Sequence, residues 1–179
     1  MIRFAPLRLC EKQMTEQLQH IDAKLFEILD SVSDPEIPVL SIMEMGVVRS
    51  AKVENGVVEV IITPTYSGCP AMDVIGEDIK SAFQKAGLEA KVELVLSPAW
   101  TTDWITPKGR LALEKYGIAS PLDAEADKEA LLGNKKLVKC PQCGSLNTKL
   151  ISQFGSTACK AFFQCEDCQE PFDYFKCLK

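Results

Sequence analysis

Two pairs of cysteines near the end of the chain have the spacing of a metal site. Cys140 and Cys143 form one C-x₂-C pair, and Cys165 and Cys168 form the other. Each pair turns two thiolates to one side of a tight knuckle, and two knuckles can surround one tetrahedral cation. Four sulfur ligands leave no position for water, so we expect a closed, structural zinc site. Four thiolates also suit iron, and a redox-active or transferable metal is the alternative.

Cys69 is a second candidate for chemistry. It precedes Pro70, a residue type typical of the first position of a helix, so we expect Cys69 at the helix N-cap. A helix N-terminus stabilises a thiolate and lowers the pKa of the thiol. The other interpretation is a small buried residue with a packing role.

The acidic loop around Asp34 and Glu36 is fixed by Pro35 and Pro38. Alone, such a loop is usually a solvated turn. If the fold brings it beside Cys69, a thiolate and one or two carboxylates would form a metal site with both soft and hard ligands.

Trp100, Asp103 and Trp104 lie in one short loop that contains both tryptophans of the chain. They form either a contact surface for a partner or part of the core. The single histidine, His20, has no nucleophile or acid in a suggestive pattern, so we expect a surface residue and no Cys-His catalytic arrangement.

The composition excludes several classes of protein. The chain has 179 residues and a formal net charge of −5, which argues against binding to nucleic acid or to an anionic membrane. Eight cysteines could indicate a secreted disulfide protein. However, the first residues lack the apolar segment of a signal peptide, and no apolar run is long enough to span a bilayer. We therefore expect a cytoplasmic protein with reduced cysteines.

The hydrophobic pattern predicts an α+β fold. A two-layer domain over residues 14–119 is expected, with the order helix, strand, strand, helix, strand, helix. Residues 120–137 are predicted to be a linker, and residues 138–179 a small zinc-ribbon domain. Within the first domain, Asn55-Gly56 predicts a hairpin, and the six elements are expected at 14–32, 47–54, 57–63, 70–86, 91–96 and 107–116.

Several strings of residues resemble a known family. The segments 34–39, 63–70 and 98–104 resemble the MIP18-like family, also called DUF59. Within it, segments 154–161 and 170–177 are similar to the zinc-ribbon extension of one branch, whose members accompany the phenylacetyl-CoA epoxidase of aerobic phenylacetate degradation. The resemblance implies a two-layer MIP18-like domain followed by a Cys₄ ribbon.

The resemblance also implies a function. It implies an accessory factor without turnover of its own, which assists iron–sulfur cluster or iron-site assembly in the epoxidase subunits or their iron–sulfur reductase. Cys69 matches the reactive cysteine of the family, and Asp34 and Glu36 match its acidic motif. The ribbon cysteines match the structural zinc ligands, whereas the roles of Cys159 and Cys177 stay open.

Two other functions compete with this one. The protein could be a stoichiometric structural subunit that stabilises the oxygenase complex without transferring metal. It could also be a cysteine-dependent enzyme acting on the CoA thioester, but the sequence offers neither an evident general base nor an oxyanion site.

Overall fold

The computed structural model describes residues 21–122, 124–132 and 137–176. The chain divides into two compact units, Met1–Trp104 and Ile105–Lys179, each of which is described by itself. Within the described residues, no helix combines the length and the apolar character needed to cross a membrane.

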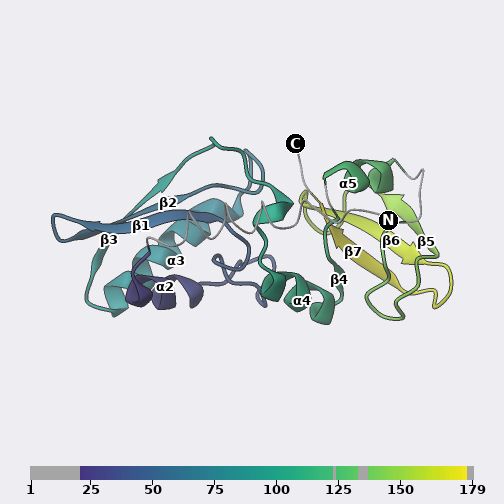
Figure 1. Cartoon of the computed structure of the whole chain (residues 1–179), viewed down its shortest axis with the longest axis horizontal. Helices are drawn as coiled ribbons and strands as arrows, with labels where there is room; N and C mark the ends of the chain where they lie inside the picture. Colours follow the sequence, from purple (N-terminus) through teal and green to yellow (C-terminus); the bar gives the residue numbers. More distant parts are fainter. Residues whose placement is uncertain (1–20, 123, 133–136, 177–179) are drawn as a thin grey trace, which may run out of the picture. The chain divides into compact units, whose positions relative to one another are not determined.

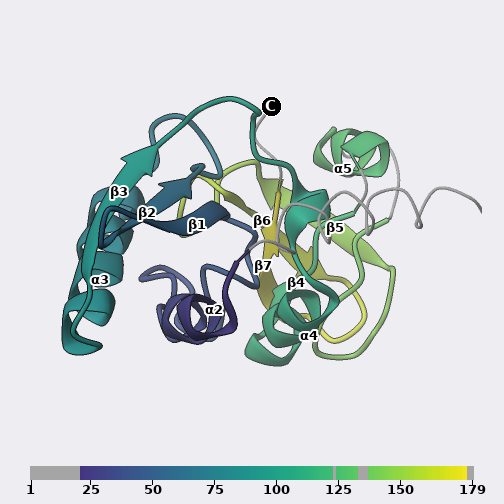
Figure 2. The ribbon, with the colours of Figure 1, turned by 60° about the vertical axis from the view of Figure 1, so that its left-hand side comes forward.

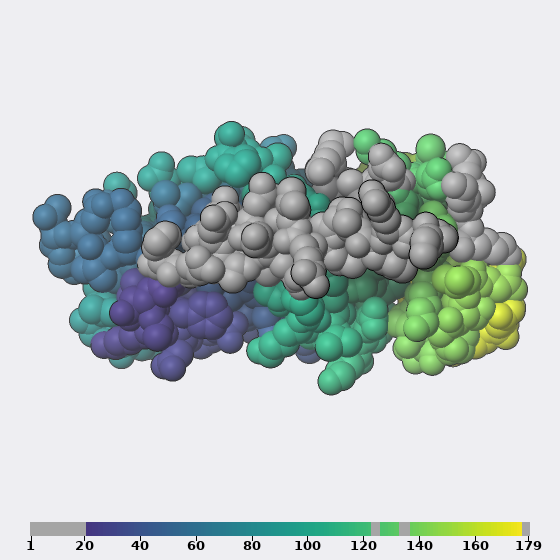
Figure 3. Space-filling view, viewed as in Figure 1, coloured from purple at the N-terminus to yellow at the C-terminus, as the bar shows by residue number. Residues whose placement is uncertain are grey.

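The first unit is a three-stranded sheet with two helices on one face (Figures 1 and 2). The strands lie in the order β1-β2-β3; β1 and β2 are antiparallel, and β2 and β3 are parallel. The β1–β2 turn projects at the tip of this unit (Figure 3). The elements in chain order are α2 (Ala23–Asp30), β1 (Val48–Glu54), β2 (Val57–Ile62), α3 (Ala71–Lys85), β3 (Glu89–Leu94) and the 3-10 helix η1 (Thr102–Trp104).

Local sequence signals explain most of these elements. Asn55 and Gly56 both have positive φ, 51° and 85°, as a tight turn between antiparallel strands requires. The apolar positions of α3 recur every three or four residues, and Met72, Ile75, Ile79 and Phe83 are buried. The two-layer α+β architecture expected from the sequence is confirmed.

Some boundaries differ from those expected. Helix α2 begins after Asp22, whose side chain accepts a hydrogen bond from the Lys24 amide, and it ends at Asp30. Residues 14–20 of the predicted helix, with His20, lie outside the described residues. Strand β3 begins at Glu89 because its ladder with β2 runs from Val57 opposite Glu89 to Ile62 opposite Leu94.

The second unit is a four-stranded sheet in the order β4-β7-β6-β5. Its core includes Phe163, Phe172 and Tyr174, with the ring of Tyr174 at 5.5 Å and edge-on to that of Phe163. The elements in chain order are α4 (Pro107–Tyr116), β4 (Ile118–Ala119), α5 (Ala124–Leu131), β5 (Thr148–Ser152), β6 (Lys160–Cys165) and β7 (Pro171–Phe175).

The division of the chain differs from the expected domain limits of 14–119, 120–137 and 138–179. Strand β4 pairs in parallel with β7, so residues before 120 already belong to the second sheet. The segment expected to be a linker contains α5, whose Ala130 is 1% exposed within the core of this unit. The sequence suggested a linker because this segment is rich in charged residues. The buried face of α5 has only a few small apolar residues, which give a weak helical pattern.

Candidate functional site

Cys69 lies just before α3, at the end of the loop that follows β2. Its backbone amide donates a hydrogen bond of 3.1 Å to the carbonyl of Tyr66, which closes the loop into a turn. The N-cap of α3 is Pro70, not Cys69 as expected, and Pro70 has helical backbone angles. Cys69 therefore precedes the helix cap by one residue, with its side chain half-buried.

The pKa of the Cys69 thiol is raised, whereas its place beside a helix suggested a lowered pKa. Burial is the largest cause, because it penalises the charged thiolate. A hydrogen bond from the Ala71 amide, at the start of α3, acts in the opposite direction, as does the hydroxyl of Thr65. The negative charges of Glu36 and Asp34 raise the pKa further. The helix N-terminus does assist the thiolate, but burial and the two acids outweigh it.

The same interactions place the acidic loop close enough to act on Cys69. Asp34 is 6% exposed, and its Oδ1 accepts hydrogen bonds from the amides of Glu36, at 2.7 Å, and Ile37, at 2.9 Å. Glu36 is half-buried. The thiol of Cys69 is thus within electrostatic reach of two carboxylates near the start of α3, and sulfur and carboxylate oxygen are soft and hard types of metal ligand.

Thr63 adds a buried hydroxyl at the base of the Cys69 loop. The residue is 1% exposed, and its Oγ1 has no hydrogen-bond partner among the described residues. Its amide donates to the carbonyl of Val47, so the backbone there continues the β1–β2 pairing by one residue.

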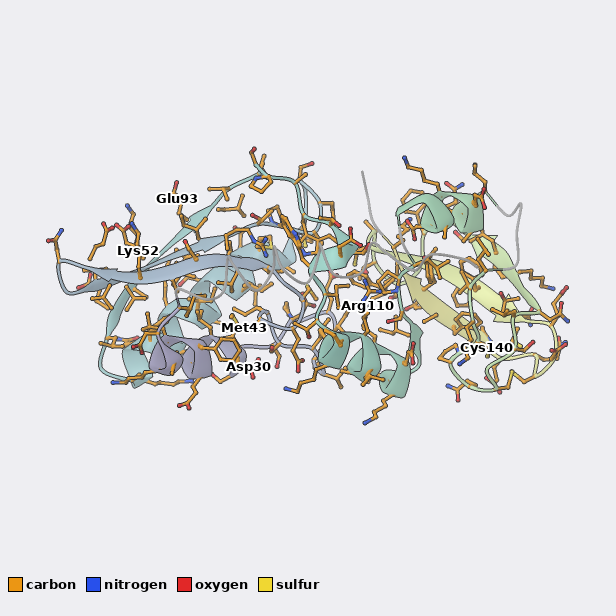
Figure 4. The ribbon with its side chains drawn as sticks, viewed as in Figure 1. Asp30, Met43, Lys52, Glu93, Arg110 and Cys140 are labelled. Carbon is orange, nitrogen blue, oxygen red and sulfur yellow. The ribbon has the colours of Figure 1, made fainter. Side chains whose placement is uncertain are left out.

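The four cysteines of the two C-x₂-C pairs converge in the second unit. Their sulfur atoms all lie within 4.8 Å of one another. Cys140 Sγ is 3.8 Å from Cys168 Sγ, and Cys143 Sγ is 3.5 Å from Cys165 Sγ. Zinc–sulfur bonds of about 2.3 Å in a tetrahedron separate the sulfurs by about 3.8 Å, so this set fits zinc. Figure 4 labels Cys140 in the first knuckle.

The metal centre is closed and partly exposed. Cys140 and Cys165 are buried, at 1% and 0% exposure, whereas Cys143 is exposed. The backbone amide of Cys168 donates to the sulfur of Cys165 and lowers the pKa of that thiol to about 7. Because four thiolates fill a tetrahedron, the arrangement would hold the metal as a structural element without an open coordination position.

Cys159 lies at the other end of β6 from the ligand Cys165. It is 5% exposed, its sulfur is 3.0 Å from Thr157 Oγ1, and it is absent from the group of converging sulfurs. The strand between them separates the two sulfurs, because each residue of an extended strand advances by about 3.3 Å. Cys177 lies outside the described residues.

The tryptophan loop packs mainly into the first unit. Trp100 is 3% exposed, and its indole nitrogen donates to the carbonyl of Met45 at 3.1 Å. Trp104 is half-buried beneath the guanidinium of Arg49, which lies 3.6 Å from its ring centre. Asp103 is exposed. Any contact with a partner would involve Asp103 and the open part of Trp104, since Trp100 belongs to the core.

Sequence reasoning missed some residues that shape these sites. Arg49 is half-buried, and burial lowers its pKa to about 10. It also donates to the carbonyl of Gly46. A single arginine in a strand gave no signal of its role, which depends on Trp104 far along the chain. Ser145, Asn147 and Asp167 beside the ribbon cysteines were also missed, although polar residues within two C-x₂-C knuckles are a usable signal.

Each of the two units contains a match to a known protein family. Residues 22–95 match the model of a family described as iron–sulfur cluster assembly proteins. Residues 124–176 match the model of the PaaD zinc beta ribbon domain. Cys69 falls within the first match, and the four converging cysteines fall within the second.

The chain is also similar to individual proteins. A protein of Escherichia coli, provisionally named as one of the subunits of 1,2-phenylacetyl-CoA epoxidase, is 46% identical over 87% of this chain and 92% of that protein. An Fe-S protein maturation auxiliary factor of Porphyromonas gingivalis is 30% identical over 56% of this chain and 97% of that protein. A solved DUF59 domain from Bacillus anthracis, 29% identical, covers 50% of this chain and 88% of its own, with a TM-score of 0.47. The chain therefore belongs to the PaaD family of phenylacetyl-CoA epoxidase subunits, with a MIP18-like (DUF59) domain followed by a zinc ribbon.

Proposed function

We propose that this protein helps to install iron or an iron–sulfur cluster in the subunits of a phenylacetyl-CoA epoxidase system, without turnover of its own. The observation that supports the proposal is that the charges of Asp34 and Glu36 act on the half-buried Cys69 in the unit that matches iron–sulfur cluster assembly proteins. The names of its relatives, an epoxidase subunit and an Fe-S protein maturation auxiliary factor, supply the client and the process.

The electrostatics of Cys69 suit a site that receives metal and passes it on. Its raised pKa keeps the thiol protonated at neutral pH, so an incoming cation must displace a proton to form the iron–sulfur bond. Asp34 and Glu36 attract the cation and offset its positive charge once it is bound. Because protons compete with the metal at this thiol, the site would hold its cargo weakly enough to release it to a client.

The ribbon has a different role in this proposal. Its four thiolates would hold zinc as a permanent part of the fold, and metal binding would contribute much of the folding free energy of so small a sheet. The ribbon would then contact the client, while the cargo travels through Cys69. Asp103 and the open part of Trp104 provide a second candidate contact.

The proposal is tested by the metal content of the client. The epoxidase subunits and their reductase are produced in cells lacking this protein and supplied with the wild type, Cys69→Ser or Cys159→Ser. Cys159 is a matched control, since it is a cysteine of the other unit that is not one of the converging ligands. We expect full iron and cluster occupancy with the wild type and Cys159→Ser, and a several-fold lower occupancy with Cys69→Ser. Equal occupancy with all three would overturn the transfer role.

A second candidate function is a stoichiometric structural subunit. It is favoured by the name of the E. coli relative, which describes a component of the epoxidase itself, and by the closed cysteine set, which offers a rigid surface and no open metal position. In that case the protein would co-purify with the oxygenase in a fixed ratio, unaffected by Cys69→Ser. Removal of residues 105–179 would abolish the association. The iron and cluster content of the epoxidase subunits would then depend on formation of the complex and not on the thiol of Cys69.

A further inference from the structure

Three polar side chains connect the two cysteine knuckles. Asp167 lies between Cys165 and Cys168 in the second knuckle. Its Oδ2 accepts a hydrogen bond of 2.5 Å from the hydroxyl of Ser145, and its Oδ1 accepts one of 2.7 Å from the side-chain amide of Asn147. Both donors follow closely after the first knuckle, so one carboxylate spans the two halves of the metal centre.

The donors are themselves held by the first knuckle. The carbonyl of Ser145 accepts a hydrogen bond of 2.9 Å from the amide of Cys140, and the Ser145 hydroxyl accepts one of 2.9 Å from the amide of Asn147. The carbonyl of Asn147 accepts a bond of 2.7 Å from the amide of Glu166, next to Asp167. These bonds tie each side chain to the backbone that carries a ligand, so movement of one knuckle is transmitted to the other.

We infer that Asp167, with Ser145 and Asn147, is a clamp that keeps the two pairs of thiolates at ligand distance and slows the release of the ribbon metal. Asp167 is a positioning residue, because it acts on the metal through the knuckles and is not one of the converging ligands. The inference concerns the resident metal and does not depend on the proposed role of Cys69.

The negative charge of Asp167 also affects how tightly the metal is held, separately from its hydrogen bonds. A carboxylate beside four thiolates repels them, so the charge favours separation of the ligands in the absence of metal but also attracts the cation. Asp167 is exposed, and solvent and salt screen exposed charges effectively, so both charge effects are small. Two charge-assisted hydrogen bonds that join the halves of the site are lost outright when the carboxylate is removed. The clamp therefore predicts weaker retention of the metal without Asp167, whereas repulsion between the carboxylate and the thiolates predicts tighter retention.

Zinc release from the full-length, zinc-loaded protein tests the clamp. An excess of a colorimetric chelator reports the release rate for the wild type, Asp167→Ala, Asp167→Asn, Ser145→Ala and Glu170→Gln. We expect release about 10-fold faster for Asp167→Ala, in line with the loss of a residue that orients metal ligands. The increase should be smaller for Asp167→Asn, whose amide oxygen still accepts a bond, and for Ser145→Ala, which keeps every charge.

Glu170→Gln is the matched control for charge. Glu170 is an exposed acid close after Cys168 that contributes its backbone carbonyl to the knuckle, and this contact survives the substitution. We expect its release rate to equal that of the wild type. Cobalt-substituted proteins should all show the same tetrahedral thiolate spectrum, because the four ligands are unchanged. Wild-type release rates in both Asp167→Ala and Ser145→Ala, or slower release in Asp167→Ala and Glu170→Gln together, would overturn the clamp.

Discussion

Asp34 holds Glu36 in place through a hydrogen bond of 2.7 Å from the Glu36 amide to Asp34 Oδ1. The same oxygen accepts from the next amide, that of Ile37, so the buried carboxylate fixes the turn from within. Glu36, half-buried, is thereby presented where its charge acts on Cys69. Both acids act on Cys69 through their charge, and Asp34 has the additional task of shaping the loop that holds Glu36.

Glu36→Gln should make Cys69 more reactive. The Glu36 charge is one cause of the raised pKa, so its removal lowers the pKa and increases the thiolate fraction near pH 7 to 8. The rate of alkylation of the Cys69 peptide by iodoacetamide, followed by mass spectrometry in the zinc-loaded protein, measures this effect. Glu27→Gln, on the exposed side of α2, is the control and should react like the wild type. An unchanged rate in Glu36→Gln would show that its charge does not act on the thiol.

Gly46→Ala should destabilise the first unit far more than Gly56→Ala. Both glycines have positive φ, 69° and 85°, so each alanine carries a similar backbone cost of about 1 to 2 kcal/mol. A Cβ at residue 46 would lie 2.3 Å from the carbonyl oxygen of Trp104, whereas one at residue 56 has nothing within 4 Å. The clash should raise the cost for Gly46→Ala to about 3 kcal/mol or more. Chemical unfolding curves measure both, and equal losses would contradict the close packing of the Trp104 backbone on Gly46.

Tyr174→Phe should destabilise the second unit by about 1 to 3 kcal/mol, because it removes a buried hydrogen bond to a carboxylate. The Tyr174 hydroxyl donates to Asp127 at 2.5 Å and accepts from the amide of Leu122 at 3.1 Å. The phenylalanine keeps the ring and hence the contact with Phe163. Thermal unfolding with zinc present measures the loss, and Tyr116→Phe, on an exposed residue, is the control.

The effect of Tyr174 should also depend on pH. Burial is the largest cause that raises its pKa, and the charge of Asp127 adds to it. The folded protein therefore keeps the hydroxyl protonated, while an unfolded chain loses that proton near pH 10, the ordinary pKa of about 10 for tyrosine. The stability that Tyr174 contributes is complete below this pH and declines as the pH rises further. The difference in Tm between the wild type and Tyr174→Phe should narrow in more alkaline buffer; a constant difference would contradict this assignment.

Local signals were enough to predict much of the fold. The Asn55-Gly56 turn specifies its own backbone angles, and the spacing of Met72, Ile75 and Ile79 specifies a helix face. The two C-x₂-C pairs predicted four converging sulfurs for the same reason, since each knuckle is a short-range structure. In these cases the local structure is determined by residues that are close together in the sequence.

The remaining features depend on contacts between distant parts of the chain. The burial of Trp100 follows from its bond to Met45, and the burial of α5 follows from packing around Ala130. The sign of the pKa shift at Cys69 depends on how deeply its loop is buried, which the helix-start pattern does not encode. The clamp on Asp167 requires the second knuckle to face Ser145. Only the last of these relationships leaves a local trace in the sequence, namely the polar residues in and next to the C-x₂-C pairs.

The metal content of the protein itself tests the central claim most directly. The full-length wild type, Cys69→Ser and Cys165→Ser are purified without oxygen, and bound zinc and iron are measured in equilibrium dialysis against ferrous iron. We predict zinc in the wild type and Cys69→Ser, and iron that is present in the wild type but lost in Cys69→Ser. Cys165→Ser should lose zinc and keep iron. Iron that persists in Cys69→Ser, or that disappears with the ribbon cysteine instead, would contradict the assignment of the cargo to Cys69.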